Sequence, residues 1–239
     1  MREAKWLTRW ELRRTWRSFP ATTLVWAFFG LIASTIFLDV FEGDVDFIAA
    51  DIYLLAVCQA LVCNMGSRDS WVSPQTAFPD RLAFFRGLPI AARDIVTSRA
   101  LSRVPVLVLN SVALFVLPYV LSLAAGSGLA QRLTPVSYLW FVLMWVGYGL
   151  VLGSWVFYGE LALHGRTYNL AQFIGVLPFA AIILVIEFVF SPGIVAKTID
   201  LAQAQGPLSA AVALIAGLAV VAFWIAATSR RLARRDLLA

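Results

Sequence analysis

Long runs of apolar residues, separated by shorter polar segments, follow one another along almost the whole chain. A helix needs about 20 consecutive apolar residues to cross the hydrocarbon core of a bilayer. Six runs are long enough, and they occupy residues 21–40, 47–65, 104–125, 136–158, 171–190 and 207–228. The pattern predicts an all-α polytopic membrane protein with six transmembrane helices, built as a single domain over residues 1–239.

Two carboxylates fall inside these runs. Asp51 lies about one turn inside the second run, and Glu187 lies close to the outer end of the fifth. A carboxylate at the bilayer centre costs about 3 kcal/mol, so Asp51 is expected at the outer interface and Glu187 is expected to reach toward it. Ionisable residues within spans are functional candidates, so both are weak candidates for a substrate path. The scarcity of ionisable residues within the spans favours an apolar path for an amphipathic cargo over proton or ion coupling.

Composition strengthens the membrane assignment. Hydrophobic residues make up 61% of the 239 residues and charged residues only 14%, against roughly 25% charged residues in soluble domains. Cys58 and Cys63 are five positions apart, which matches neither a C-x-x-C redox pair nor a zinc site. Both are therefore expected to be small buried residues.

The positions of the 19 Lys and Arg residues predict the orientation, because basic residues are retained on the cytoplasmic side. Six precede the first span, six lie in the loop 66–103, one lies in the loop 159–170 and four follow the last span, which leaves Arg132 and Lys197 elsewhere. Both termini are therefore expected in the cytoplasm, with the chain in the inner membrane of a cell. Since the basic residues serve topology, the net charge of +5 does not imply a nucleic-acid partner.

The N-terminal segment 1–20 is rich in Trp and Arg, as expected of an amphipathic helix lying in the membrane interface. Its arginines fall between two apolar patches rather than on one face. A basic anchor for the first span and a functional elbow helix both remain open. Either role places the segment on the inner surface.

The cytoplasmic loop 66–103 is the longest connection, and it contains a second amphipathic pattern. Phe78, Leu82 and Phe85 fall at positions i, i+4 and i+7, which predicts one apolar stripe on a short helix and leaves Phe84 on another face. The residues after Pro89 are expected to form a further helix that runs into the third span. Periodicity alone leaves two alternatives open: the short helix packs on the inner ends of the spans, or it is presented to a cytoplasmic partner.

The stretch FFRGLPIAARDIVTSRAL resembles a segment of the type 2 ABC exporter permeases, the ABC-2 family, whose six-span topology with both ends inside is also similar. The resemblance implies that the loop 66–103 carries a coupling helix and that the loop 159–170 is a second, shorter coupling element. It also implies short helical pieces in the outer connection 191–206. The ATPase-coupling residues that it implies are Asp80, Arg81, Phe84, Phe85, Arg86, Glu160, His164 and Arg166.

The same resemblance implies the partners. Two copies of a cytoplasmic ABC ATPase would bind ATP and Mg, and a second permease subunit would complete a homodimer or heterodimer surrounded by membrane lipid. The chain itself has no G-x-x-x-x-G-K-[ST] motif, so it has no Walker A loop to hold nucleotide phosphates. No cofactor, metal or catalytic residue is expected on this chain, and it is not expected to be an enzyme by itself. A peptide or antibiotic is the favoured cargo.

Other functions remain as alternatives: export of a lipid, a glycolipid or a haem-related molecule, an intramembrane enzyme, or a channel subunit. For an enzyme, His164 lies in a cytoplasmic loop and Ser127 in an outer one, so a bilayer of about 30 Å separates the base from the nucleophile. Glu160 and His164 are spaced i, i+4, but two ligands are too few for a metal site.

Two pairs of small residues predict close helix packing. Gly149 and Gly153 share one face of the fourth span, and Ala213 and Gly217 share one face of the sixth. Small residues at this spacing let helix backbones approach each other in a membrane. Packing within the subunit is expected rather than a dimer seam.

Overall fold

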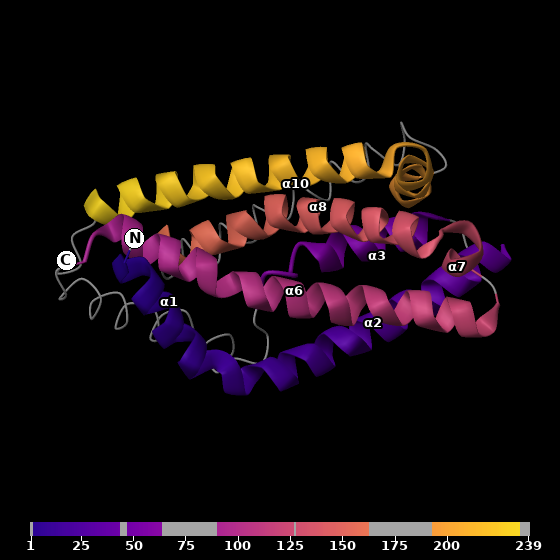
Figure 1. Cartoon of the computed structure of the whole chain (residues 1–239), viewed down its shortest axis with the longest axis horizontal. Coiled ribbons are helices and arrows are strands. Elements are labelled where there is room, and N and C mark those ends of the chain that lie inside the picture. Colours follow the sequence, from indigo (N-terminus) through magenta and orange to yellow (C-terminus); the bar gives the residue numbers. More distant parts are fainter. Residues whose placement is uncertain (1, 44–46, 64–89, 127, 163–192, 235–239) are drawn as a thin grey trace.

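The computed structural model describes residues 2–43, 47–63, 90–126, 128–162 and 193–234, and every regular element in these ranges is a helix. Four apolar helices are long enough to cross a membrane, so the chain is a helical, multi-pass membrane protein. They lie along the long axis of the molecule (Figure 1). Their bounds are α2 (Phe19–Glu42), α6 (Ala92–Ala125), α8 (Pro135–Ala162) and α10 (Ile194–Arg234). They confirm the first, third, fourth and sixth predicted spans as apolar helices; the fifth lies outside the described residues.

The N-terminal segment forms a helix of its own, as expected. Helix α1 (Arg2–Thr15) is followed by a short 3-10 turn, η1 (Trp16–Ser18), and then by α2. Figure 1 shows α1 and α2 as the two arms of an open V, with α1 against the first turns of α6. The start of α1 and the end of α10 lie at the same end of the molecule. We call this the inner end, after the orientation predicted from the basic residues.

The second predicted span differs most from expectation. Helix α3 (Phe47–Cys58) has 12 residues, or about 18 Å of length, whereas the apolar run predicts a helix to residue 65. After Cys58 the chain continues in tight turns, in which the N–H groups of Ala60 and Cys63 donate to the carbonyls of Val57 and Ala60. The described helix is therefore too short to cross a bilayer by itself.

Helix α10 is bent near its start. Gln205 has non-helical backbone angles (φ −141°, ψ 35°), and Pro207 follows it inside the helix. Figure 1 shows the first part of α10 nearly end-on, while the remainder runs along the bundle. Proline removes one helical hydrogen bond and crowds the preceding turn, which is a common cause of a sharp kink. The outer connection is thus helical from Ile194, and the predicted sixth span begins at the bend.

Helices α8 and α10 approach each other closely through small residues. A Cβ added to Gly147 would lie 2.6 Å from the carbonyl carbon of Ala213, and one added to Gly217 would lie 2.8 Å from the Gly147 carbonyl oxygen. Gly149 and Gly153 instead face the chain at the end of α3, where their added Cβ atoms would meet Cys58 and Val62. The small residues serve packing inside the subunit, as expected.

Aromatic side chains fill the centre of the bundle between α2, α6 and α8. Phe141 packs edge-on against Phe37 and Phe115 and stacks on Tyr138. The Tyr138 hydroxyl donates to the carbonyl oxygen of Phe115 at 2.6 Å, so a buried polar atom is satisfied by the neighbouring helix. A short helix, α7 (Leu129–Arg132), connects α6 to α8 at the outer end.

Candidate functional site at the inner end of the bundle

The N-terminal helix packs on the first turns of α6, which form the second half of the stretch that carries the family resemblance. Leu7 is 1% exposed and lies against Ile95 and Ile90. The Thr8 hydroxyl lies 3.3 Å from the Ser98 carbonyl oxygen, to which it donates. These contacts join two segments that are about 90 positions apart in the sequence.

A buried ion pair strengthens the same junction. The guanidinium Nη1 of Arg99 lies 3.2 Å from Oε1 of Glu11, and both side chains are largely buried. A carboxylate in a low-dielectric site is stable only where a cation or strong donors compensate it. Oε2 of Glu11 has no hydrogen-bond partner among the described residues, so removing the cation would strand the charge. Helix α1 is thus held to the beginning of α6 by a buried ion pair as well as by apolar contacts.

The inner end of α3 is held by two polar side chains of α6. Nδ2 of Asn110 donates to the carbonyl oxygens of Leu61 at 2.7 Å and Cys63 at 3.1 Å. Nη1 of Arg103 donates to the carbonyl oxygen of Val62 at 3.1 Å. These carbonyls lie in the turns beyond α3, where no helical N–H group is available to them, and a buried carbonyl needs a hydrogen-bond donor. Amide and guanidinium donors from α6 therefore stabilise the turns that end α3 within the protein.

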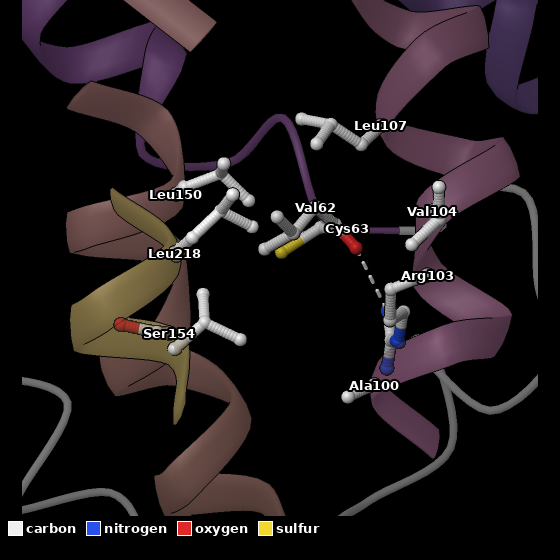
Figure 2. A pocket seen from close by; sticks show the side chains of 11 residues that line it. Val62, Cys63, Ala100, Arg103, Val104, Leu107, Leu150, Ser154 and Leu218 are labelled. Carbon is white, nitrogen blue, oxygen red and sulfur yellow. Dashed lines mark hydrogen bonds between the residues drawn. The ribbon is translucent and has the colours of Figure 1, made fainter. Parts of the chain in front are cut away.

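A cavity of about 110 Å³ lies beside these contacts. Figure 2 shows it between α6 on one side and α8 with α10 on the other, with the end of α3 above the centre. The Arg103 side chain extends toward Ala100 at one end of the cavity, and Leu107 lies at the other end. Apart from Arg103, Ser154 and the Cys63 thiol, the side chains that line it are those of Val62, Ala100, Val104, Leu107, Leu150, Leu218 and Val221.

The outer end of α3 carries the described member of the predicted substrate path, Asp51. The structure buries Asp51 completely in protein, where the N–H groups of Ile194 and Val195 donate to Oδ2 at 2.8 Å and to Oδ1 at 2.6 Å. Two donors of the first turn of α10 thereby find a partner, and the carboxylate faces the positive end of that helix. Asp51 lines neither the inner cavity nor a second, larger cavity between α8 and α10.

Gly193 makes this arrangement possible. Its φ of +114° is in a region that residues with a Cβ rarely adopt. A Cβ at this position would also collide with Oδ2 of Asp51. The backbone at Gly193 therefore passes directly beside the Asp51 carboxylate as it enters α10.

Seven of the eight predicted coupling residues lie outside the described residues, namely Asp80, Arg81, Phe84, Phe85, Arg86, His164 and Arg166. Glu187, the other member of the predicted substrate path, also lies outside them. Glu160 belongs to the last turns of α8. Of the cysteines, Cys58 is buried as expected and Cys63 is half-buried. Within the described ranges, no group of three or more His, Cys, Asp or Glu side chains is placed to hold a metal ion.

The sequence did not single out the polar residues that the structure brings together at the inner end, namely Glu11, Arg99, Arg103 and Asn110. Two signals were present: Glu11 is an acid within a basic segment, and Asn110 is an amide within an apolar run. A polar residue inside a span marks a helix contact or a functional position. No protein-family model matches the chain, and neither a curated protein nor a solved structure matches it.

Proposed function

We propose that this chain is the membrane-spanning permease subunit of an ATP-driven exporter, in which a separate ABC ATPase drives release of an amphipathic cargo such as a peptide or antibiotic. The sequence basis is the stretch FFRGLPIAARDIVTSRAL together with the absence of a Walker A motif. In this proposal the ATPase binds the short helix around Phe84 and Phe85.

One structural observation supports the proposal more than any other. The second half of the resembling stretch forms the first turns of α6, and α6 then continues without interruption into the apolar span. Helix α1 clamps these turns through Leu7, Ile95 and the Glu11–Arg99 ion pair. A displacement of the preceding loop would therefore move the first turns of α6 together with α1, and the continuous helix, which contains Pro105 at the start of the span, would carry the movement inward.

Introducing charge on the loop tests the proposal. The double variant Phe84→Asp/Phe85→Asp is expected to lose co-purification with the proposed ABC ATPase, because two carboxylates cannot enter an apolar groove without a large desolvation cost. The control is Phe84→Leu/Phe85→Leu, which keeps apolar side chains and should retain the complex. Full retention of the complex and of coupled ATPase activity by the Asp variant would overturn the proposal.

A second experiment separates binding of the ATPase from coupling. Glu11→Gln and Arg99→Gln should each leave co-purification intact and lower cargo-stimulated ATPase activity, because each breaks the buried ion pair that joins α1 to α6. The double variant Glu11→Gln/Arg99→Gln should recover part of the loss, since a neutral pair leaves no charge stranded. Equal activity in all three variants and the wild type would contradict a coupling role for this junction.

A further inference from the structure

The inner cavity opens on the apolar outer surface of the bundle. Val104 of α6 and Leu218 of α10 belong to its lining and are 51% and 59% exposed. In a membrane protein such side chains contact lipid hydrocarbon. An apolar cavity of about 150 Å³ stays dry in other proteins and takes up apolar guests, so this one of about 110 Å³ suits part of an acyl chain.

The height of the cavity corresponds to the inner leaflet. Arg103 immediately precedes the apolar run of α6. On α8, Ser154 lies one turn before Tyr158, whose hydroxyl accepts a hydrogen bond from Arg231 at the basic end of α10. The cavity therefore begins at the level of the basic residues and extends into the apolar region.

Arg103 gives the cavity a charged end. Its side chain points toward the N-terminal end of α6 (Figure 2), as helical side chains generally do, and thus toward the predicted cytoplasmic surface. A guanidinium carries five N–H donors in a planar arrangement that fits phosphate or carboxylate oxygens. An apolar chamber that leads to a guanidinium at the headgroup level matches one chemical class, an acyl chain with an anionic headgroup.

We propose that the cavity between α6, α8, α10 and the end of α3 binds an anionic phospholipid of the inner leaflet, with an acyl chain in the cavity and its phosphate at Arg103. The site goes beyond the proposed export function and needs no ATPase partner. Hydrocarbon contacts alone give little selectivity, because lipid tails outside the protein are equally apolar. Selectivity for negative lipids comes from Arg103.

The chain provides its own reporter of occupancy. Its two cysteines are Cys63, which lines the cavity, and Cys58, which is fully buried. The full chain, purified and delipidated in neutral detergent, would be treated with N-ethylmaleimide and followed by intact-mass spectrometry. Phosphatidylglycerol is expected to slow labelling of Cys63 about fivefold more than phosphatidylcholine with the same acyl chains, the ratio that one basic side chain provides at a membrane surface. Labelling of Cys58 would report unfolding instead.

Two variants with matched controls identify the site. Arg103→Gln should abolish the difference between the two lipids, while Arg230→Gln, which removes an exposed arginine of α10, should preserve it. Ala100→Phe should fill the cavity and remove protection by either lipid. Ala124→Phe, on an exposed outer position of the same helix, should behave as the wild type.

Three outcomes would overturn the site. Equal protection by both lipids in the wild type would eliminate the anionic headgroup from the recognition. Protection by inorganic phosphate alone, at the same concentration, would make the ligand a free anion rather than a lipid. An unchanged labelling rate with every lipid would eliminate the site altogether. None of these results would alter the co-purification test of the proposed function, so the two can fail separately.

Discussion

Side chains satisfy backbone groups near both ends of α3, with an acceptor at the outer end and donors at the inner end. At the outer end, the carboxylate of Asp51 accepts hydrogen bonds from the N–H groups that begin α10. At the inner end, Asn110 and Arg103 donate to carbonyl oxygens of the turns that follow α3. Backbone groups at helix ends have no partner within their own helix, and in a membrane no water is present to replace it.

The two ends differ in their surroundings. Asp51 is completely enclosed by protein and accepts two short hydrogen bonds from backbone N–H groups, which is the environment of a fixed structural contact. Arg103 is half-buried at the wall of a cavity that reaches the apolar surface. The outer end therefore holds the fold together, while the inner end combines a structural contact with a place for a ligand. The following variants test this division, in order of decreasing expected effect on stability.

Removal of the outer carboxylate should have the largest effect. Asp51→Ala leaves two buried N–H groups without an acceptor, and each such group costs about 1–3 kcal/mol, so we expect a loss of about 3 kcal/mol in the free energy of unfolding. Unfolding by sodium dodecyl sulfate, followed by tryptophan fluorescence of the detergent-solubilised protein, would measure it. Asp39→Ala is the control, because Asp39 is an exposed carboxylate near the end of α2. Equal losses in the two variants would refute a special role for Asp51.

Adding a Cβ next to Asp51 should have the next largest effect on the free energy of unfolding. Gly193→Ala forces a Cβ into a backbone conformation that it disfavours and against Asp51, at an expected cost of about 2 kcal/mol. Gly43→Ala is a matched control, since Gly43 also has a positive φ, of +90°, but has nothing within 4 Å of the added Cβ. The difference between the two variants in the same unfolding assay isolates the contact with Asp51. If Gly43→Ala is the costlier change, the contact with Asp51 is not tightly packed.

At the inner end, Asn110→Leu should cost about 1 kcal/mol, the net value of a typical hydrogen bond. It removes two bonds to carbonyl oxygens, but it also removes Oδ1, which has no partner among the described residues. The neighbouring Ser111 serves as the control, because its buried hydroxyl likewise has no partner within the described part of the chain. Ser111→Ala should be neutral or slightly stabilising in the same assay. A neutral Asn110→Leu would show that α3 ends there without help from α6.

The apolar runs were sufficient to predict four of the long helices, because a span must satisfy its own backbone and so must be helical. They were wrong about the length of the helix that begins at Phe47. Residues 47–63 contain neither Gly nor Pro, so nothing local signals a turn after Cys58. The turns accept hydrogen bonds from Asn110 and Arg103, which lie more than 40 positions away, and hydropathy carries no information about such contacts.

Contacts between residues far apart in the sequence also limited the prediction of the candidate site. The depth of Asp51 along its span pointed to the outer end, but its role as the acceptor for α10 depends on a helix that begins more than 140 positions later. Glu11 and Arg99 are surface-type residues by composition, and only the packing of α1 on α6 buries them together. The coupling residues around Phe84 stay predictions from the resemblance, because they lie outside the described residues.

The smallest effect on stability is expected for Arg103→Gln, below about 1 kcal/mol, since Arg103 is half-buried and a glutamine amide keeps a donor near Val62. The variant should also differ from the wild type in its stabilisation by lipid. A ligand that binds only the folded state raises the free energy of unfolding in proportion to the logarithm of its concentration. Phosphatidylglycerol should therefore stabilise the wild type and Asp51→Ala alike, but not Arg103→Gln. A loss for Arg103→Gln as large as that for Asp51→Ala, unchanged by lipid, would make the inner end a structural contact like the outer one.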